Sequence, residues 1–270
     1  MGKTAVVLMI MQLVEAIILG VTQGVTEFLP VSSSGHLFLA RQVLGIDDVD
    51  GTAFDAFLHL GTLLAVIIYY WKVWVGMGRG LVLTDEEGVD KRNLAAKLAV
   101  ATVPAAIAGY GAQSYVDGWL RSDWIVAGGL VLTALALLVD GWGPKVRKER
   151  VSFKDALIIG LVQVMALVPG VSRSGVTMAA GRGRGLGRKQ AVTFSFLMSA
   201  PIIAGAGLAS LSGLLAGHAF SGEVLVAGFL TAFVSGLVAI TGLMKVVEKI
   251  SLVPFAIYLV AAAVVMLYAG

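Results

Sequence analysis

Long apolar segments alternate with short polar connections along most of the chain. The longest apolar runs cover residues 53–71, 98–112, 124–139, 191–217, 224–244 and 252–270. A helix needs about 20 predominantly apolar residues to cross the hydrocarbon core of a bilayer, and most of these runs approach or exceed that length. The pattern therefore predicts an integral membrane protein in which these runs form transmembrane helices.

The composition supports the same class. Of the 270 residues, 58% are hydrophobic and only 14% are charged, whereas charged residues make up about 25% of a soluble globular protein. The absence of cysteine excludes disulfides, thiolate catalysis and sulfur-ligated metals. The net charge of +3 is typical of basic cytoplasmic loops. Because no run of aromatic and basic residues suggests a nucleic-acid surface, we expect membrane lipids and no nucleic acid as partners.

Basic residues gather in four clusters that predict the orientation in the membrane. Sixteen of the 20 lysines and arginines belong to them: Lys72, Arg79, Lys91, Arg92 and Lys97; Lys145, Arg147, Lys148, Arg150 and Lys154; Arg182, Arg184, Arg188 and Lys189; Lys245 and Lys249. Cytoplasmic loops are enriched in Lys and Arg, so we expect all four clusters inside the cell. The acidic loop Asp47–Asp50 and the turn Asp117–Asp123 are then expected outside.

This orientation leaves two polar segments that enter and leave the membrane on one side. Residues 8–43 precede an inward span, so they are expected to enter and leave from outside. Residues 155–181 lie between two cytoplasmic clusters, so they are expected to enter and leave from inside. The predicted fold class is thus all-α integral membrane, with six transmembrane helices, two re-entrant helical hairpins and both termini outside.

The two polar segments also resemble each other at an offset of 140 residues. Six identities fall within 16 ungapped positions, and they pair Gly20 with Gly160, Gln23 with Gln163, Val31 with Val171, Ser32 with Ser172, Ser34 with Ser174, and Gly35 with Gly175. We interpret residues 1–270 as a single membrane domain of two repeat halves, about 8–141 and about 153–270. Each half has one hairpin and three spans, and an odd number of spans inverts the second half.

The first hairpin carries a carboxylate, serines and a histidine around a helix break. Gln23 and Glu27 are four residues apart and share one helix face. Pro30 ends that helix, and the motif continues as Val31-Ser32-Ser33-Ser34-Gly35-His36. A new helix would begin at the serines, and a helix N-terminus with hydroxyl side chains is a ready anion site. His36, three residues after Ser33, can return to the same face.

The second hairpin adds a cation. It reads Pro169-Gly170-Val171-Ser172-Arg173-Ser174-Gly175, and an arginine in an apolar segment indicates function by default. Its planar fork matches phosphate oxygens. The repeat places Arg173 opposite Ser33, so Glu, Ser, His and Arg converge on an anion of phosphate size, a constellation suited to phosphoryl transfer.

Each of these residues also has a structural alternative. Glu27 could cap a helix or pair with Arg173, the serines could satisfy backbone groups at the helix breaks, and His36 could be a hydrogen-bond partner. His59 is a lone histidine in an apolar span and is expected to be structural. His218 lies in a loop and is expected to be incidental.

The motifs closely resemble the signatures of a known family. The stretch from Leu19 to His36 resembles the first signature of the undecaprenyl-diphosphate phosphatase (bacitracin-resistance) family, and Pro169–Gly175 looks like its second. Similarity continues through residues 60–66, 103–105, 194–197 and 254–258, and so extends over most of the chain.

The resemblance implies a membrane enzyme that removes one phosphate from a polyprenyl diphosphate and regenerates the monophosphate carrier for envelope glycan synthesis. By motif position, the family's catalytic residues correspond to Glu27, Ser33, His36 and Arg173. The family depends on a divalent cation, either Mg²⁺ or Ca²⁺, which is expected near Glu27. Many members carry Glu where this chain has Gln23, and a neutral amide is a weaker metal ligand.

The remaining polar positions of both motifs are expected to bind substrate: Gln23, Ser32, Ser34, Gly35, Ser172, Ser174 and Gly175. The lipid would enter from the outer leaflet, into a site that opens to the outer face. Three questions stay open at this point. Ser33 or an activated water could attack phosphorus, the carrier could be undecaprenol or a dolichol-type lipid, and the protein could act as a homodimer. The alternative function is a lipid-carrier or anion transporter or flippase, because inverted repeats with broken helices are typical of carriers.

Overall fold

The computed structural model describes residues 3–46, 51–116, 122–142, 148–217 and 220–269. The elements in these ranges are α1 (Lys3–Phe28), α2 (Ser33–Leu44), α3 (Gly51–Tyr69), α4 (Trp71–Gly80), α5 (Glu86–Val116), α6 (Asp123–Leu137), α7 (Val139–Trp142), α8 (Phe153–Gln163), the 3₁₀ turn η1 (Val164–Leu167), α9 (Arg173–Gly183), α10 (Arg188–Gly217), α11 (Gly222–Val246) and α12 (Val253–Ala269). Strands are absent from the described residues, which contain one isolated bridge between Lys148 and Leu186. The predicted all-helical class is confirmed.

Five helical stretches in the described residues are each long and apolar enough to cross a membrane: those of α1, α5, α10 and α11, and α6 together with the start of α7 (Asp123–Gly141). A sixth span results if α3 and α4, which bend by 71° at their junction, are counted as one. Helix α12 is apolar but shorter, over Val253–Tyr268. The chain is therefore a multi-pass helical membrane protein. By length alone α1 can span the membrane, whereas α2, α8 and α9 have only 11 or 12 residues each.

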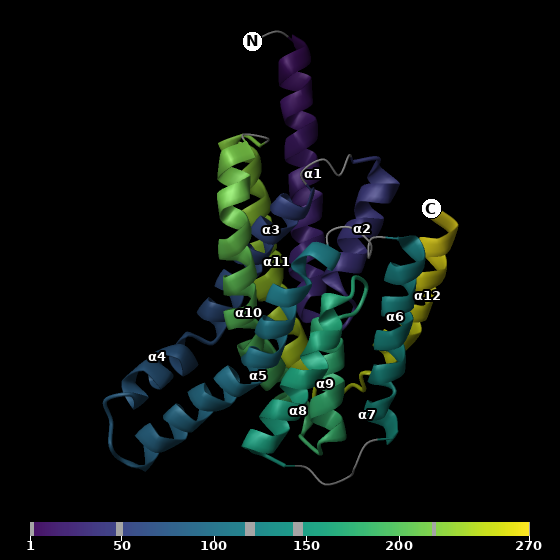
Figure 1. The fold of residues 1–270 in the computed structure, drawn as a ribbon. Helices are drawn as coiled ribbons and strands as arrows, with labels where there is room; N and C mark the ends of the chain where they lie inside the picture. The colour runs from purple at the N-terminus through teal and green to yellow at the C-terminus, as the bar shows by residue number, and fades with distance from the viewer. Residues whose placement is uncertain (1–2, 47–50, 117–121, 143–147, 218–219, 270) are drawn as a thin grey trace.

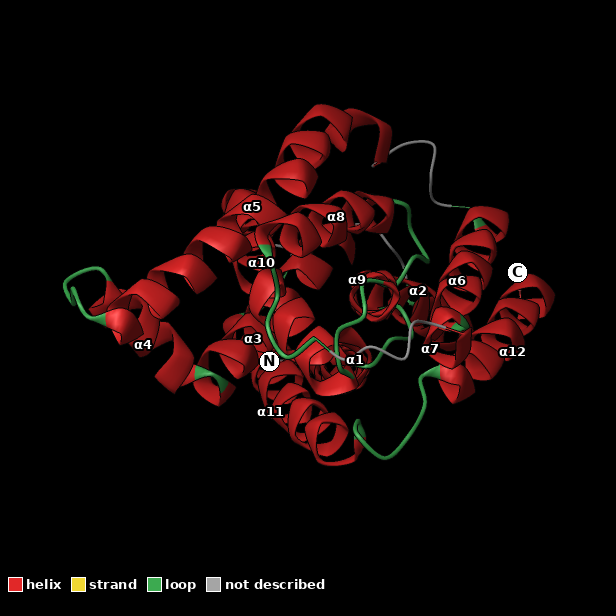
Figure 2. Cartoon of the chain, turned by 90° about the horizontal axis from the view of Figure 1, so that it is seen from below, coloured by secondary structure: helices red, strands yellow, loops and turns green. Residues whose placement is uncertain are grey.

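The helices form one bundle with α9 near its centre (Figure 2). Helix α1 lies along α11, and α6 lies along α12, while α8 packs on α5. Two glycines allow α1 to approach α11 closely. A Cβ atom on Gly20 would lie 2.6 Å from the Gly228 carbonyl oxygen, and one on Gly24 would lie 2.5 Å from that of Ala232. Small residues at four-residue spacing are a common device for close helix contact in membranes, where hydrophobic burial does not drive association.

The start of α1 and the end of α12 lie toward the same end of the bundle, and α8 rises from the opposite end (Figure 1). Ion pairs at that opposite end link the predicted cytoplasmic clusters. Arg150 pairs with Asp90, Arg184 and Lys148 share Asp155, and Lys189 approaches Glu248. Four segments that are distant in the sequence thus meet at one end of the molecule.

A second carboxylate at this end ties together three further helix ends. Asp140 lies in α7, which directly follows α6, and its side chain is fully buried. It accepts hydrogen bonds from Arg182 at 2.5 Å and from Arg188 at 3.0 Å, and also from Ser251 and the Leu252 N–H, each at 2.9 Å. Several donors are required because a buried charge without partners costs several kcal/mol. Asp140 therefore fixes the ends of α9, α10 and α12 against α6.

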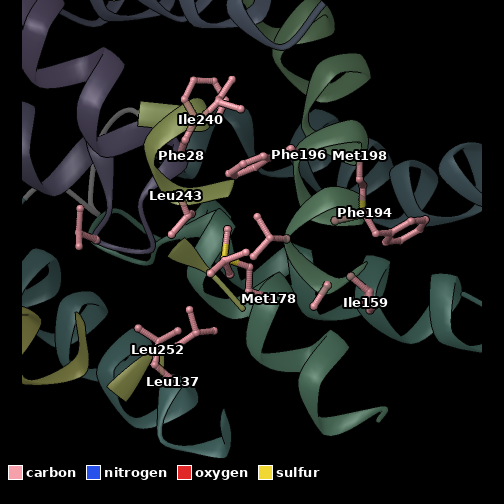
Figure 3. Close-up of a cluster of buried hydrophobic side chains, with 14 of the residues drawn as sticks. Phe28, Leu137, Ile159, Met178, Phe194, Phe196, Met198, Ile240, Leu243 and Leu252 are labelled. Atoms are coloured by element: carbon pink, nitrogen blue, oxygen red, sulfur yellow. The ribbon is translucent and has the colours of Figure 1, made fainter. Parts of the chain in front are cut away.

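The main hydrophobic core gathers side chains from α1, α6, α8, α9, α10 and α11, as the close-up in Figure 3 shows. Phe28, the last residue of α1, packs edge to face on Phe196 with ring centroids 5.2 Å apart. Met178 of α9 and Ile240 of α11 are fully buried in the same cluster. The end of α1 is thus anchored by apolar contacts directly beside Glu27.

Some predicted features fall outside the described residues. These are the acidic loop Asp47–Asp50, most of the turn Asp117–Asp123, the basic residues Lys145 and Arg147, and His218.

Asp155 predicts how stability depends on pH. It is fully buried at the start of α8, outside the candidate spans. Burial raises the pKa of its carboxyl, but hydrogen bonds from Ser152, Arg184 and Lys148 outweigh that effect and lower the pKa to about 2. The resulting stabilisation, about 2 kcal/mol, is fully present above the unfolded-state pKa of about 4 and is lost as the pH falls through about 2.

We therefore expect Asp155→Asn to lower the thermal unfolding temperature in detergent at neutral pH, with a difference from the wild type that shrinks toward about pH 2. Asp90→Asn is the matched control because its pair with Arg150 is exposed, and exposed pairs contribute little. Equal effects of the two substitutions at neutral pH would contradict the prediction.

Candidate functional site

We call the breaks before α2 and before α9 the two polar turns, and in each of them a serine side chain caps the helix that follows. In the first, Ser32 has a positive φ of 70° and its hydroxyl accepts a hydrogen bond from the Gly35 N–H at 3.3 Å, which caps α2. In the second, Ser172 accepts from the Gly175 N–H at 3.1 Å and caps α9. The serine two residues later lies within hydrogen-bond distance of each cap, at 3.3 Å for Ser34 and 3.1 Å for Ser174 in the second turn. A serine N-cap satisfies an N–H that the helix itself leaves unpaired.

The second turn requires glycine for two reasons. Gly170 has φ of 87°, a region that other residues rarely adopt. It also packs against α6, where an added Cβ would clash with the Val126 carbonyl oxygen at 2.1 Å. The Ser172 N–H donates to the Thr133 hydroxyl of α6 at 2.9 Å. Helix α6 therefore positions the residue that begins α9.

Side chains join the two turns directly. The Ser174 hydroxyl donates to the Leu29 carbonyl oxygen at 2.9 Å, and the Gly170 N–H donates to the Ser34 hydroxyl at 3.4 Å. An ion pair completes the contact, with Arg173 Nη2 2.5 Å from Glu27 Oε1. The residues that begin α2 and α9 are therefore brought together with the end of α1.

The Glu27 carboxylate is the centre of the polar contacts. Its Oε1 atom accepts from Arg173, while Oε2 accepts from the Ser33 hydroxyl at 2.6 Å and from Gln23 Nε2 at 3.1 Å. His59 Nε2 lies 3.5 Å from the same Oε2. The Glu27 side chain is only 6% exposed and that of Arg173 13%, so both charges are shielded from solvent and depend on each other.

A cavity of about 440 Å³ opens on this cluster. Six of the predicted site residues line it: Glu27, Ser33, Ser34, Ser172, Arg173 and Ser174. Four others lie behind that wall. Gln23 is fully buried and donates to Glu27, and Ser32, Gly35 and Gly175 form the caps of α2 and α9. The site therefore exposes hydroxyls, a guanidinium and two helix N-termini, whose first-turn N–H groups have no partner within the helix. Helix N-termini and arginine together favour an anion.

The structure does not place His36 on this cavity. Its Nε2 lies 2.6 Å from the Tyr258 hydroxyl, and its Nδ1 lies 2.8 Å from the Ser32 carbonyl oxygen. The ring also stacks on Tyr258 with centroids 5.6 Å apart. In this arrangement His36 supports the turn that carries Ser33.

Two residues that the motifs did not single out do line the cavity. Asp55 and His59 lie one turn apart on α3. Asp55 forms a two-armed ion pair with Arg41, at 2.9 and 2.7 Å, and its backbone carbonyl contacts His59 Nδ1 at 2.7 Å. That contact turns His59 Nε2 toward Glu27. His59, which the sequence suggested to be structural, thus lines the cavity beside Glu27, and the available signal for it was a carboxylate and a histidine four residues apart in an apolar run.

The protein side chains by themselves do not form a multidentate cation site. No group of three or more His, Asp or Glu side chains in the described ranges could hold a metal ion. Both Glu27 oxygens already accept hydrogen bonds, and Asp55 is engaged by Arg41. A cation at this site would have to take most of its ligands from water or a bound anion and add a single protein carboxylate, as Mg²⁺ commonly does.

Fold and site together define a polytopic helical membrane protein with a polar cavity between two helix turns. Residues 16–265 match the family described as bacitracin resistance protein BacA, and the chain belongs to this family. Three relatives are each named undecaprenyl-diphosphatase. The protein of Rubrobacter xylanophilus is 44% identical over 94% of this chain and 96% of its own length. That of Maricaulis maris is 41% identical over 95% and 98%, and that of Alteromonas mediterranea 40% over 96% and 98%.

The cavity geometry predicts selective binding of an anion. We expect inorganic pyrophosphate to bind the detergent-purified protein, as measured by calorimetry. Arg173→Gln should weaken this binding about tenfold or more, because charge-assisted hydrogen bonds contribute about 1.5–3 kcal/mol each. Arg150→Gln should have no effect, since that side chain is 83% exposed and lies at the basic end.

His59 tests the finer geometry of the same site. His59→Ala should weaken pyrophosphate binding, and His59→Gln should restore it, because an amide N–H can reach the Glu27 carboxylate in place of the imidazole. Thermal unfolding of each variant identifies any loss of binding that arises from misfolding. Pyrophosphate affinity unchanged in a folded Arg173→Gln protein would contradict the anion site.

Proposed function

We propose that this protein hydrolyses undecaprenyl diphosphate to the monophosphate and inorganic phosphate, and so recycles the lipid carrier for envelope glycan synthesis. It is a membrane hydrolase of the bacitracin resistance protein family. The relatives that it matches over nearly their whole length are named undecaprenyl-diphosphatase. The observation that carries the proposal is the convergence of Ser33, Glu27 and Arg173 on one cavity. A nucleophile, a base and a phosphate clamp are the groups that phosphoryl transfer requires.

The reaction would begin when the terminal phosphate replaces the Glu27 carboxylate as the partner of the Arg173 guanidinium. Glu27 Oε2 already accepts a hydrogen bond from the Ser33 hydroxyl at 2.6 Å and is therefore placed to take its proton. Ser33 Oγ attacks the terminal phosphorus, its proton moves to Glu27 Oε2, and the bond from phosphorus to the bridging oxygen breaks. The prenyl monophosphate leaves, and the phosphoryl group stays on Ser33.

The second half returns the enzyme to its starting state. A water molecule attacks the phosphorus of the phosphoserine, and the bond from phosphorus to Ser33 Oγ breaks. Glu27 returns the proton that it took to Ser33 Oγ, and both protons of the water leave with the inorganic phosphate. Arg173 and the first-turn N–H groups of α2 and α9 would stabilise the charge on the phosphoryl oxygens in both halves. His36 remains a predicted catalytic residue, and its contact with the Ser32 carbonyl supports a role in holding Ser33 in place.

We further propose that the hairpins α1–α2 and α8–α9 enter the membrane from opposite faces as parts of an inverted repeat within one domain. The short lengths of α2, α8 and α9 support this arrangement, as do the paired serine caps at positions 32 and 172. The basic ion-pair network at one end supports a cytoplasmic location for that end. Both termini would then be outside, and the site would open to the outer face.

Release of phosphate tests the function. We expect the purified protein in detergent to release inorganic phosphate from undecaprenyl diphosphate, whereas a carrier or flippase with the same architecture would release none. Ser33→Ala should lower kcat at least about 100-fold, because loss of a nucleophile removes the covalent route. Turnover by Ser33→Ala at the wild-type level would eliminate Ser33 as the nucleophile in favour of an activated water.

We propose that the divalent cation, Mg²⁺ or Ca²⁺, enters with the diphosphate, with Glu27 as its one protein carboxylate. Such a cation supplies charge neutralisation of the phosphate oxygens. Electron paramagnetic resonance of Mn²⁺ tests this without turnover. We expect weak Mn²⁺ binding by the protein alone and tighter binding when inorganic pyrophosphate is added, with the increase over free pyrophosphate lost in Glu27→Gln. Equally tight binding without pyrophosphate would instead indicate a resident metal site.

A further inference from the structure

A second, apolar hollow lies next to the polar cavity. It has a volume of about 720 Å³ and is bounded by α3, α4, α5 and α10. Twelve of its 13 lining residues are apolar, among them Leu63, Ala99, Ala106, Pro201 and Ala204. The remaining lining residue is Thr102, whose hydroxyl donates to the Leu98 carbonyl oxygen at 2.7 Å. We call this hollow the apolar groove.

The apolar groove and the polar cavity share three helices. On α3, His59 lines the cavity, and Leu63, one turn further along, lines the groove. On α5, Ala105 faces the cavity and the adjacent Ala106 the groove, while on α10 Ile203 and Ala204 divide in the same way. A molecule held in the cavity therefore contacts three helices that also line the groove.

Three features shape the groove. Helix α4 bends away from α3 by 71°, which separates α3 from the first half of α5 (Figure 1). The facing surfaces of α5 and α10 carry alanines, which leave space that larger side chains would fill. Pro104 in α5 and Pro201 in α10 lie within helices at the level of the groove, and each removes a backbone hydrogen bond and bends its helix.

We propose that the apolar groove binds the isoprenoid chain of the same lipid whose diphosphate occupies the polar cavity. This inference rests on the proposed function. The chain is covalently attached to the diphosphate, so it must leave the cavity at some point, and the groove is an apolar exit lined by three of the same helices. The pairing of a polar head site with an apolar hollow matches an amphiphile rather than a soluble phosphate ester.

The groove would select among prenyl substrates by the shape and length of the chain and not by its hydrophobicity. The chain comes from the lipid bilayer, and apolar surface transferred from lipid to an apolar wall gains little from the hydrophobic effect. The groove would instead contribute van der Waals contacts with the chain and the alignment of the terminal phosphate with Ser33. A side chain that fills the groove should therefore harm long-chain substrates while sparing short ones.

The test compares two substrates in three variants. We would measure kcat/KM for undecaprenyl diphosphate and for geranyl diphosphate in the wild type, Ala99→Phe, Ala204→Phe and Ala261→Phe. Ala99 is exposed on the groove wall, so a phenylalanine can be added there without displacing core residues. Ala261 is an exposed alanine on α12, away from the groove, and is the matched control.

We expect both groove variants to lose about tenfold or more in kcat/KM for undecaprenyl diphosphate, a factor of the size that steric changes in apolar pockets produce. Geranyl diphosphate should be hydrolysed as in the wild type, and Ala261→Phe should leave both substrates unaffected. Equal losses for the two substrates, or no loss for either, would overturn the groove assignment. Failure of the wild type to hydrolyse either substrate would instead refute the proposed function.

A second experiment distinguishes the prenyl chain from a bilayer acyl chain as the occupant of the groove. Short-chain detergent is replaced by nanodiscs of phosphatidylglycerol, and the same ratio of long-chain to short-chain activity is measured. We expect the Ala99→Phe effect to persist in nanodiscs. If the groove instead holds a bilayer acyl chain, Ala99→Phe will no longer change this ratio in nanodiscs, and the assignment will be wrong.

Discussion

The ion pair between Glu27 and Arg173 joins the two halves of the site across 146 residues of sequence. Its atoms are 2.5 Å apart, and both side chains are largely withdrawn from solvent. Removing one partner of a buried pair costs about 3–5 kcal/mol, because the other charge is left uncompensated. The pair therefore constrains how the end of α1 meets the start of α9. A bound phosphate can replace the Glu27 carboxylate as the partner of the Arg173 guanidinium.

The surrounding structure serves to keep that pair in place. Gly20 and Gly24 let α1 lie close to α11, and Phe28 packs on Phe196 immediately after the carboxylate. Thr133 holds the start of α9 from the side of α6. At the basic end, Asp140 binds donors from the ends of α9, α10 and α12 and fixes the far end of the helix that begins with Arg173. Each constraint acts on one helix, and together they leave the polar turns little freedom.

The site joins chemistries of opposite kinds at a short distance. Hydroxyls, a guanidinium and helix N-termini face the polar cavity, while alanines and leucines line the apolar groove beside it. A lipid with a diphosphate head needs both surfaces. The charged head requires polar partners once it is withdrawn from water, and the chain requires apolar surroundings. The helices α3, α5 and α10 contribute to both surfaces, so a change in their packing would alter head and tail sites together.

The sequence by itself determined the membrane class, the helical character and the positions of the two polar turns, because hydrophobic run length and helix-breaking residues are local properties. It also identified Glu27, Ser33 and Arg173 as a group, since the repeat at offset 140 aligns the turns. The roles of the two histidines depended on tertiary structure. His36 turns toward Tyr258 of α12, and His59 turns toward Glu27 through its contact with the Asp55 carbonyl. Side-chain direction is set by which helices pack together, and no local pattern encodes that choice.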